Sequence, residues 1–263
     1  MLGAMCGDAI GSPYEFGNMK NYDFDLFVEN CKLTDDSFMT AAVAEAIMSC
    51  QDIGELDSAC SRQYRIFARN HIDAGYGGMF RKWALSDTTE NLKSWGNGAA
   101  MRVSPVGWLF DNENDVIEAA TKTAIPTHGS PEGIRGARAI ALCVFLTRKG
   151  ISKDKLKDRI ETDFYYDLNE PIDSIRKWYK FDVSCQMSVP VGIRAYLEST
   201  NFEDAIRLAV STGGDSDTIG TMTGAIAEAA YGVPDHISDK VLSMMSPDIA
   251  STYAKFAKRI QSI

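Results

Sequence analysis

Gly213-Gly214-Asp215-Ser216-Asp217-Thr218 places two carboxylates two residues apart, directly behind a Gly-Gly break. Residues 218–230 follow, are mostly small and apolar, and are predicted to form a helix with Gly220, Gly224 and Ala227 on one narrow face. The predicted N-terminal helix, residues 1–10, has a small face of its own made of Gly3, Ala4, Gly7 and Gly11, and close backbone packing is the usual compensation for glycines there. Taken alone, the stretch indicates only a helix that begins with acidic residues.

A second stretch, Leu33-Thr34-Asp35-Asp36-Ser37, has the same character and opens a helix predicted over residues 34–50. Thr34 or Asp35 can cap this helix, and the two aspartates would lie in its first turn, where the helix dipole favours anions. By itself this is an ordinary helix cap. We expect the two acidic stretches to meet in the fold. Four carboxylates packed together repel one another unless cations lie between them, so such a meeting implies a metal centre.

Composition limits the class of protein. The 263 residues are 45% hydrophobic and 24% charged, as in an ordinary globular chain that forms one large domain or two small ones. The net charge of -9 argues against a nucleic-acid surface, which needs a basic stripe. No signal peptide and no apolar run of the ~20 residues that span a membrane is evident, and we expect a cytoplasmic monomer. Its cysteines are scattered and predicted to be reduced thiols: Cys6, Cys31, Cys50, Cys60, Cys143 and Cys185.

Few segments alternate with a period of two, and most are Ala-rich, capped and 10 to 17 residues long. The sequence therefore predicts an all-α fold with a single domain over residues 1–263. We expect residues 126–131 to break one helix and Pro190 to lie in the first turn of another. The charged region 149–182 is predicted to form peripheral helices, and residues 235–263 one or two closing helices. The other predicted helices are residues 1–10, 34–50, 56–71, 79–85, 99–106, 115–127, 132–148, 189–198, 202–211 and 218–230.

Hydroxyl and carboxylate groups without clusters of His or Cys suit a hard divalent ion, Mg²⁺ first, with Mn²⁺ or Ca²⁺ as alternatives. Four aspartates, two threonines and added waters are enough ligands for two such cations. Two ions about 3.5–4 Å apart can activate a water, anchor a diol or phosphate and steady a leaving group. Phosphatases and pyrophosphatases would use the same residue types, so the residues alone leave the reaction open.

Three loops and one acid inside an apolar segment add candidate contacts. Gly96-Asn97-Gly98 precedes the predicted helix 99–106 and could hold a phosphate at its N-terminus, although Gly-Asn-Gly is common in ordinary turns. His128, on a predicted loop, is more typical of a surface residue than of a ligand contact. Glu15 follows a Gly-Ser-Pro helix break and is either a surface residue or functional. Asp8 is either a hydrogen-bonded structural carboxylate or a partner of the metal site.

Together these motifs resemble the ADP-ribosylglycohydrolase family, which includes dinitrogenase-reductase-activating glycohydrolases and the ADP-ribosylarginine and ADP-ribosylserine hydrolases. The resemblance extends from Gly3 to about Pro234, and the order of the motifs is more specific than any one of them. The motifs are Gly7-Asp8-Ala9-Ile10-Gly11, Thr34-Asp35-Asp36, Gly96-Asn97-Gly98 through Met101-Arg102, Thr127-His128 and Gly214-Asp215-Ser216-Asp217-Thr218.

The resemblance implies an all-helical, orthogonally packed domain with two Mg²⁺ (or Mn²⁺) ions in a cleft. The ions would hold the ribose beside the scissile glycosidic bond of an ADP-ribosylated protein or small-molecule conjugate. The implied metal ligands are Thr34, Asp35, Asp36, Asp215, Asp217 and Thr218. The implied contacts to the rest of the substrate are Ser94, Trp95, Gly96, Asn97, Gly98 and His128, with residues 76–78 near the adenosine end.

The loop of Glu15 resembles that of members that cleave O-linked ADP-ribose, in which this glutamate is the acid/base residue. Ser37 departs from the Thr that many relatives have, but it keeps the hydroxyl. The expected reaction is therefore Mg²⁺-dependent hydrolysis that releases ADP-ribose, with Glu15 or Asp36 orienting or deprotonating the attacking water. A Mg²⁺-dependent phosphohydrolase and a non-catalytic ADP-ribose-binding relative are the alternatives. The second would be expected to lack some of the four metal carboxylates, which are all present here.

Overall fold

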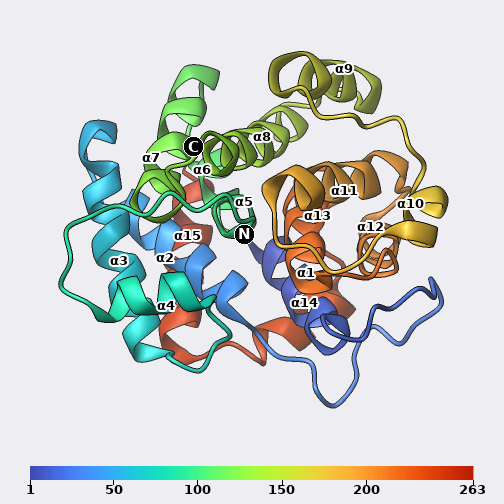
Figure 1. Cartoon of the computed structure of the whole chain (residues 1–263), viewed down its shortest axis with the longest axis horizontal. Coiled ribbons are helices and arrows are strands. Elements are labelled where there is room, and N and C mark those ends of the chain that lie inside the picture. Colours follow the sequence, from blue (N-terminus) through green and yellow to red (C-terminus); the bar gives the residue numbers. More distant parts are fainter. Residues whose placement is uncertain (263) are drawn as a thin grey trace.

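The computed structural model describes residues 1–262, and within them the elements are helices, as the sequence predicts (Figure 1). The only β-type pairings in this range are two isolated bridges, Lys93 with His128 and Gly96 with Ser184. Ile263, at the end of the predicted closing segment, lies outside the described residues. The α-helices are α1 (Leu2–Gly11), α2 (Asp35–Ser49), α3 (Leu56–Asn70), α4 (Gly78–Leu85), α5 (Gly98–Met101), α6 (Ser104–Leu109), α7 (Glu113–His128), α8 (Pro131–Arg148), α9 (Lys153–Phe164), α10 (Ile172–Trp178), α11 (Cys185–Glu198), α12 (Phe202–Val210), α13 (Ser216–Tyr231), α14 (Asp235–Leu242) and α15 (Pro247–Ile260), with 3₁₀ turns at Ser12–Tyr14 and Ile53–Glu55.

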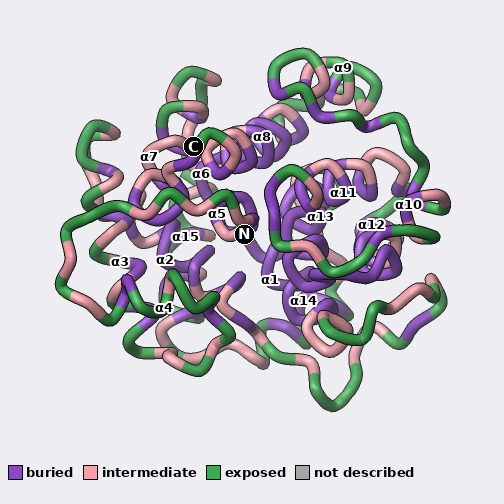
Figure 2. Tube along the Cα trace, in the orientation of Figure 1, coloured by how far each residue is buried: buried purple, intermediate pink, exposed green. Residues whose placement is uncertain are grey.

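Helices α1 and α13 form the buried centre of the fold, where Figure 2 shows continuous burial. They come into backbone contact through facing glycines: a Cβ at Gly7 would overlap the carbonyl of Gly220, and one at Gly3 would overlap that of Gly224. Only glycine allows such an approach. The loss of helix propensity at these positions, about 1 kcal/mol each, is therefore offset by close packing. This contact fixes the start of α13, where Asp215 and Asp217 lie.

Three helix boundaries differ from the prediction. Helix α7 continues through Pro126 to His128, because the side chains of its last turn are buried. Helix α11 begins at Cys185, capped by Ser184, so Pro190 lies inside it and not in its first turn. The predicted helix 99–106 is split into α5 and α6. Pro105 has no N–H for the preceding turn, and α6 restarts with this proline in its first turn.

The core consists of one large apolar cluster and a smaller one between α10, α11, α12 and α13. The charged region 149–182 forms α9 and α10, which lie at the periphery, as predicted (Figure 1). Cysteines 6, 60, 143 and 185 are buried, and all six thiols are free. Across residues 1–262, no helix has both the length and the apolar character required to cross a membrane.

Candidate functional site

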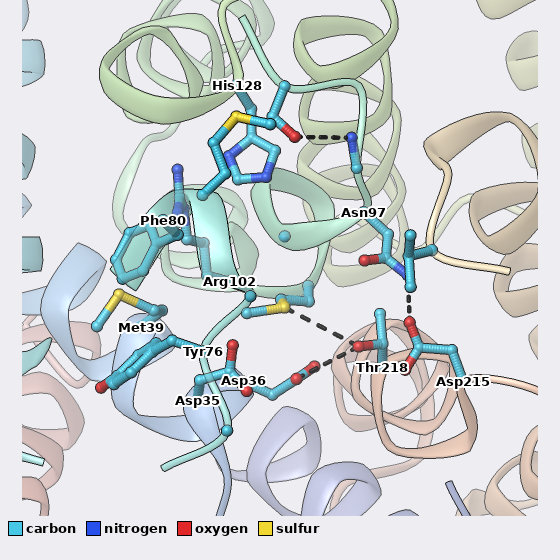
Figure 3. Close-up of a pocket in the computed structure, with 18 of the residues that line it drawn as sticks. Asp35, Asp36, Met39, Tyr76, Phe80, Asn97, Arg102, His128, Asp215 and Thr218 are labelled. Atoms are coloured by element: carbon cyan, nitrogen blue, oxygen red, sulfur yellow. Dashed lines mark hydrogen bonds between the residues drawn. The ribbon is translucent and has the colours of Figure 1, made fainter. Parts of the chain in front are cut away.

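A cavity of about 380 Å³ lies between the start of α2, the start of α13 and the loop before α5. In Figure 3 the carboxylates of Asp35, Asp36 and Asp215 occupy one side, and Tyr76, Phe80 and Met39 form an apolar wall on the other. The glycine loop and His128 close the remaining side. The cavity thus joins an acidic end, an apolar wall and a set of potential hydrogen-bond donors.

The structure brings the two acidic stretches together. The hydroxyl of Thr218 donates a hydrogen bond of 3.3 Å to Asp36 Oδ2. One carboxylate oxygen from each of Glu15, Asp215 and Asp217 lies within 4.8 Å of the others, an arrangement that could hold a metal ion. Asp215 is further fixed by Asn97, whose side-chain amide donates to its Oδ2 at 2.6 Å. Residues from the two ends of the chain, Glu15 and Asp217 among them, therefore form one acidic cluster.

Burial and mutual repulsion raise the pKa values of this cluster. The pKa of Asp36, Asp35 and Asp217 is raised well above the usual range, first by desolvation and then by neighbouring carboxylates. Desolvation also raises the pKa of Asp215 to about 6. Desolvation, followed by the charge of Asp217, raises that of Glu15 to about 7. The cluster is costly to ionise without a counter-charge, which is the electrostatic condition that favours a bound cation.

Asp8 holds the first acidic stretch in place. Its carboxylate accepts hydrogen bonds from the Thr34 amide at 2.8 Å, the Thr34 hydroxyl at 2.7 Å and the Ser37 amide at 3.1 Å, as well as from the Ser37 hydroxyl. Asp8 is therefore a hydrogen-bonded structural carboxylate, and the groups that it binds belong to the helix start that carries Asp35 and Asp36. The Thr34 hydroxyl also accepts from the Asp36 amide at 3.4 Å and does not line the cavity.

The glycine loop is fixed by backbone hydrogen bonds to the start of α11. The Asn97 amide donates to Val183 O at 2.7 Å, and the Cys185 amide donates to Trp95 O at 3.1 Å. A Cβ at Gly98 would lie 2.9 Å from His128 Nε2, so only glycine leaves that nitrogen clear. The expected long helix behind the loop is the four-residue α5, so the helix dipole contributes less here than predicted.

His128 is buried and lines the cavity, so the surface position typical of a lone histidine on a loop is wrong, whereas the position near the substrate that the family resemblance implies remains compatible with the structure. The reason is that α7 continues to His128 and turns its ring inward. Burial, followed by the charge of Arg102, holds the His128 pKa well below its usual value, so the ring is neutral. Arg102 donates to the Thr127 hydroxyl at 2.7 Å, and that hydroxyl lies 2.8 Å from His128 Nδ1. The Thr127 hydroxyl has one proton and two lone pairs, so it can donate to Nδ1 or accept from it, and the other ring nitrogen, Nε2, faces the glycine loop.

The other predicted contacts divide into two groups. Ser94, Gly96, Asn97 and Gly98 line the cavity, whereas Trp95 is 55% exposed and lies outside its lining. Several further lining residues carry no signal in the sequence, because a lone apolar side chain is indistinguishable from core when it lies on a helix and from an ordinary loop residue when it does not. These are Met39, Phe80, Phe16, Phe181 and Val183.

A sequence model of the family described as ADP-ribosylglycohydrolase matches residues 1–261. The chain belongs to this family. It is 24% identical to mouse ADP-ribosylhydrolase ARH3 (89% of this chain, 83% of the relative) and 27% identical to Xenopus tropicalis ARH3 (88% and 86%). It is 26% identical to ADP-ribosylarginine hydrolase Tri1 of Serratia proteamaculans (92% and 74%).

The fold of this family member also matches a solved structure. The TM-score is 0.71 with a chain of an "ADP-ribosylglycohydrolase-related protein complex", and the match covers 98% of this chain and 95% of that chain. The two sequences are 22% identical, so this likeness concerns the fold alone.

Proposed function

We propose that this family member hydrolyses the glycosidic bond between ADP-ribose and an acceptor, a protein side chain or a small molecule, and so reverses ADP-ribosylation. The observation that carries the proposal is that one cavity holds both the acidic cluster and the donor groups of the glycine loop and His128. A ribose beside the carboxylates and a diphosphate beside the donors would fit that division. ARH3 and Tri1 are named as hydrolases of this kind.

The residues fit a hard divalent cation. The donor atoms are carboxylate and hydroxyl oxygens, and Asp36 Oδ1 is buried without a hydrogen-bond partner among residues 1–262. Such an orphaned acceptor calls for a ligand. Two Mg²⁺ ions, with Mn²⁺ as the alternative, would be held by Asp35, Asp36, Asp215, Asp217 and Thr218. Thr34, the remaining implied ligand, would join them only if its hydroxyl turned from Asp8 towards the cavity. Bound Mg²⁺ would supply charge stabilisation and would lower the pKa of a coordinated water.

The chain's own groups would orient the rest of the substrate. His128 Nε2, as a donor in the tautomer that carries its proton there, and the backbone around Gly96 and Gly98 face the cavity, and the buried Arg102 adds positive charge behind them. Hydrogen bonds to a charged phosphate are about twice as strong as neutral ones. These groups would therefore bind the diphosphate and fix the ribose next to the carboxylates, which leaves the anomeric carbon facing Glu15.

Glu15 is the better candidate for the general base, and Asp36 is the other. Cations bound beside Glu15 would keep its carboxylate ionised, so it could take a proton from the attacking water and return it to the leaving group. Asp36 is more deeply buried, and one of its oxygens already accepts from Thr218. We therefore assign proton transfer to Glu15 and cation binding to Asp36.

The test is release of ADP-ribose from peptides modified on arginine or on serine, measured by chromatography with Mg²⁺ and with excess chelator. We expect ADP-ribose as the product, loss of activity in chelator, and a large loss in Glu15→Gln. The matched control is Asp239→Asn, an exposed carboxylate outside the cavity, which should behave like the wild type. Release of phosphate in place of ADP-ribose would favour a phosphohydrolase, and tight binding of ADP-ribose without turnover would favour a non-catalytic relative.

A further inference from the structure

Two phenylalanines form an exposed apolar rim at the mouth of the cavity. Phe16 is 83% exposed and Phe181 is 49% exposed, yet their rings pack together with centroids 5.6 Å apart at an interplanar angle of 32°. Val183 continues this rim, and all three residues line the cavity. Exposed apolar side chains that gather beside a polar cleft are typical of a binding surface.

The rim is tied to the acidic cluster. Phe16 directly follows Glu15, so it lies at the acidic end of the cavity. Lys20 donates to the carbonyl of Tyr179 at 2.6 Å and to that of Thr212, and thus connects the segment after Phe16 to the segments before Phe181 and before Asp215. The carbonyl of Val183 accepts from Asn97 at 2.7 Å. The backbone segments that carry the two phenylalanines are therefore tied to the segments that carry the carboxylates.

The position of the rim indicates what it would contact. A cavity of about 380 Å³ accommodates one small-molecule ligand, and an ADP-ribosyl group is itself that large. With the ribose at the carboxylates and the diphosphate at the glycine loop, the leaving group has no room inside. It must extend from the anomeric carbon past Glu15 to the mouth, where Phe16 is the next residue.

We propose that Phe16 and Phe181, with Val183, form a leaving-group subsite that binds the polypeptide around the modified side chain. The inference rests on the proposed function and extends it from the ADP-ribosyl group to the acceptor. The occupant is a polypeptide because a small leaving group would end at Glu15, whereas a peptide chain continues over the rim and offers apolar side chains and flat amide groups to it. Aromatic side chains bury a large apolar area in such contacts and dominate the energetics of many interfaces.

The experiment compares one linkage in two sizes of substrate: ADP-ribosyl-serine and ADP-ribosyl-arginine as free amino acids, and the same linkages inside a nine-residue peptide. For the linkage that is cleaved, we expect the wild type to show a lower KM for the peptide. Phe16→Ala and Phe181→Ala should each raise the peptide KM about 3- to 10-fold and leave the free-amino-acid KM unchanged. Because both rings are exposed, neither substitution removes core packing. Ile66→Ala, an exposed apolar residue outside the cavity, is the matched control.

The Kd of ADP-ribose, measured by calorimetry on the same variants, shows whether the two phenylalanines contact the ADP-ribosyl group or the leaving group. Unchanged ADP-ribose affinity together with a raised peptide KM supports the subsite. An equal loss for ADP-ribose and peptide would mean that the pair contacts the ADP-ribosyl group, and an unchanged peptide KM would mean that it contacts nothing; either result overturns the inference. If the wild type cleaves neither linkage, the proposed function fails. The subsite is then judged from binding alone. The Kd of the modified peptide must be higher in both Phe variants than in the wild type, and the Kd of ADP-ribose must be the same in all three proteins.

Discussion

Thr218 donates a hydrogen bond to Asp36, whose stretch lies 182 residues earlier in the chain. Helix α1 connects the two. Its glycine face fixes the start of α13, and its Asp8 accepts four hydrogen bonds from Thr34 and Ser37 at the start of α2. The acidic cluster is thus assembled by a helix that lies outside the cavity lining.

Asp217→Asn tests whether the cluster is a cation site. Removing one buried negative charge relieves repulsion, so the metal-free variant should unfold about 2–4 °C higher than the wild type at pH 7.5. The Mg²⁺-induced rise in Tm should disappear, and ADP-ribose release should fall about 100-fold or more. Calorimetry with and without Mg²⁺ measures the first two effects. A normal Mg²⁺ response in this variant, with Asp239→Asn as control, would contradict the cation site.

The dependence of stability on pH follows from the same charges. In the metal-free chain the folded-state pKa values of Asp215 (about 6) and Glu15 (about 7) lie above their unfolded values of about 4. As pH rises from 4 to 7, the unfolded chain loses these protons first, so this contribution to stability is present below pH 4 and is lost by about pH 7. Mg²⁺ binds the ionised groups, so its effect on Tm should be larger at pH 8 than at pH 5. Thermal unfolding at the two pH values, each with Mg²⁺ and with chelator, measures this difference. Equal Mg²⁺ shifts at both values would show that these carboxylates do not titrate with the cation.

The sequence predicted most of the helices and the acidic stretches, because caps, helical spacing and glycine breaks are local features. Local patterns did not predict that His128 is buried, and only the family resemblance placed it near the substrate. Its burial depends on whether α7 ends at Pro126 or continues, and packing against Arg102 decides that question. Phe16 and Phe181 were missed for a related reason. Their pairing joins a loop near the N-terminus to the segment before α11, and no local pattern encodes it.

His128→Leu tests the proposed diphosphate contact. Loss of one hydrogen bond to a charged group costs about 1.5–3 kcal/mol, so the Kd of ADP-ribose should rise about 10- to 100-fold. His128→Gln, which keeps an N–H donor, should recover part of that affinity. Because the folded-state pKa of His128 lies well below 6.5, this contact should not change between pH 6 and 8 in the wild type. Calorimetric titration measures each Kd. An affinity in the leucine variant equal to that of the wild type would remove His128 from the site.

Gly7→Ala tests whether the contact between α1 and α13 sets the geometry of the acidic cluster. The added Cβ would overlap the Gly220 carbonyl, and backbone atoms cannot move aside as a flexible side chain can. The free energy of unfolding should therefore fall by about 3 kcal/mol or more. Gly78→Ala is the matched control, because nothing lies within 4 Å of its Cβ position and alanine favours the first turn of α4. Urea unfolding measures both variants. If the folded Gly7→Ala variant also binds Mg²⁺ more weakly and Gly78→Ala does not, helix spacing and cation binding are coupled. An unchanged free energy of unfolding in Gly7→Ala would show that the two helices can separate without cost.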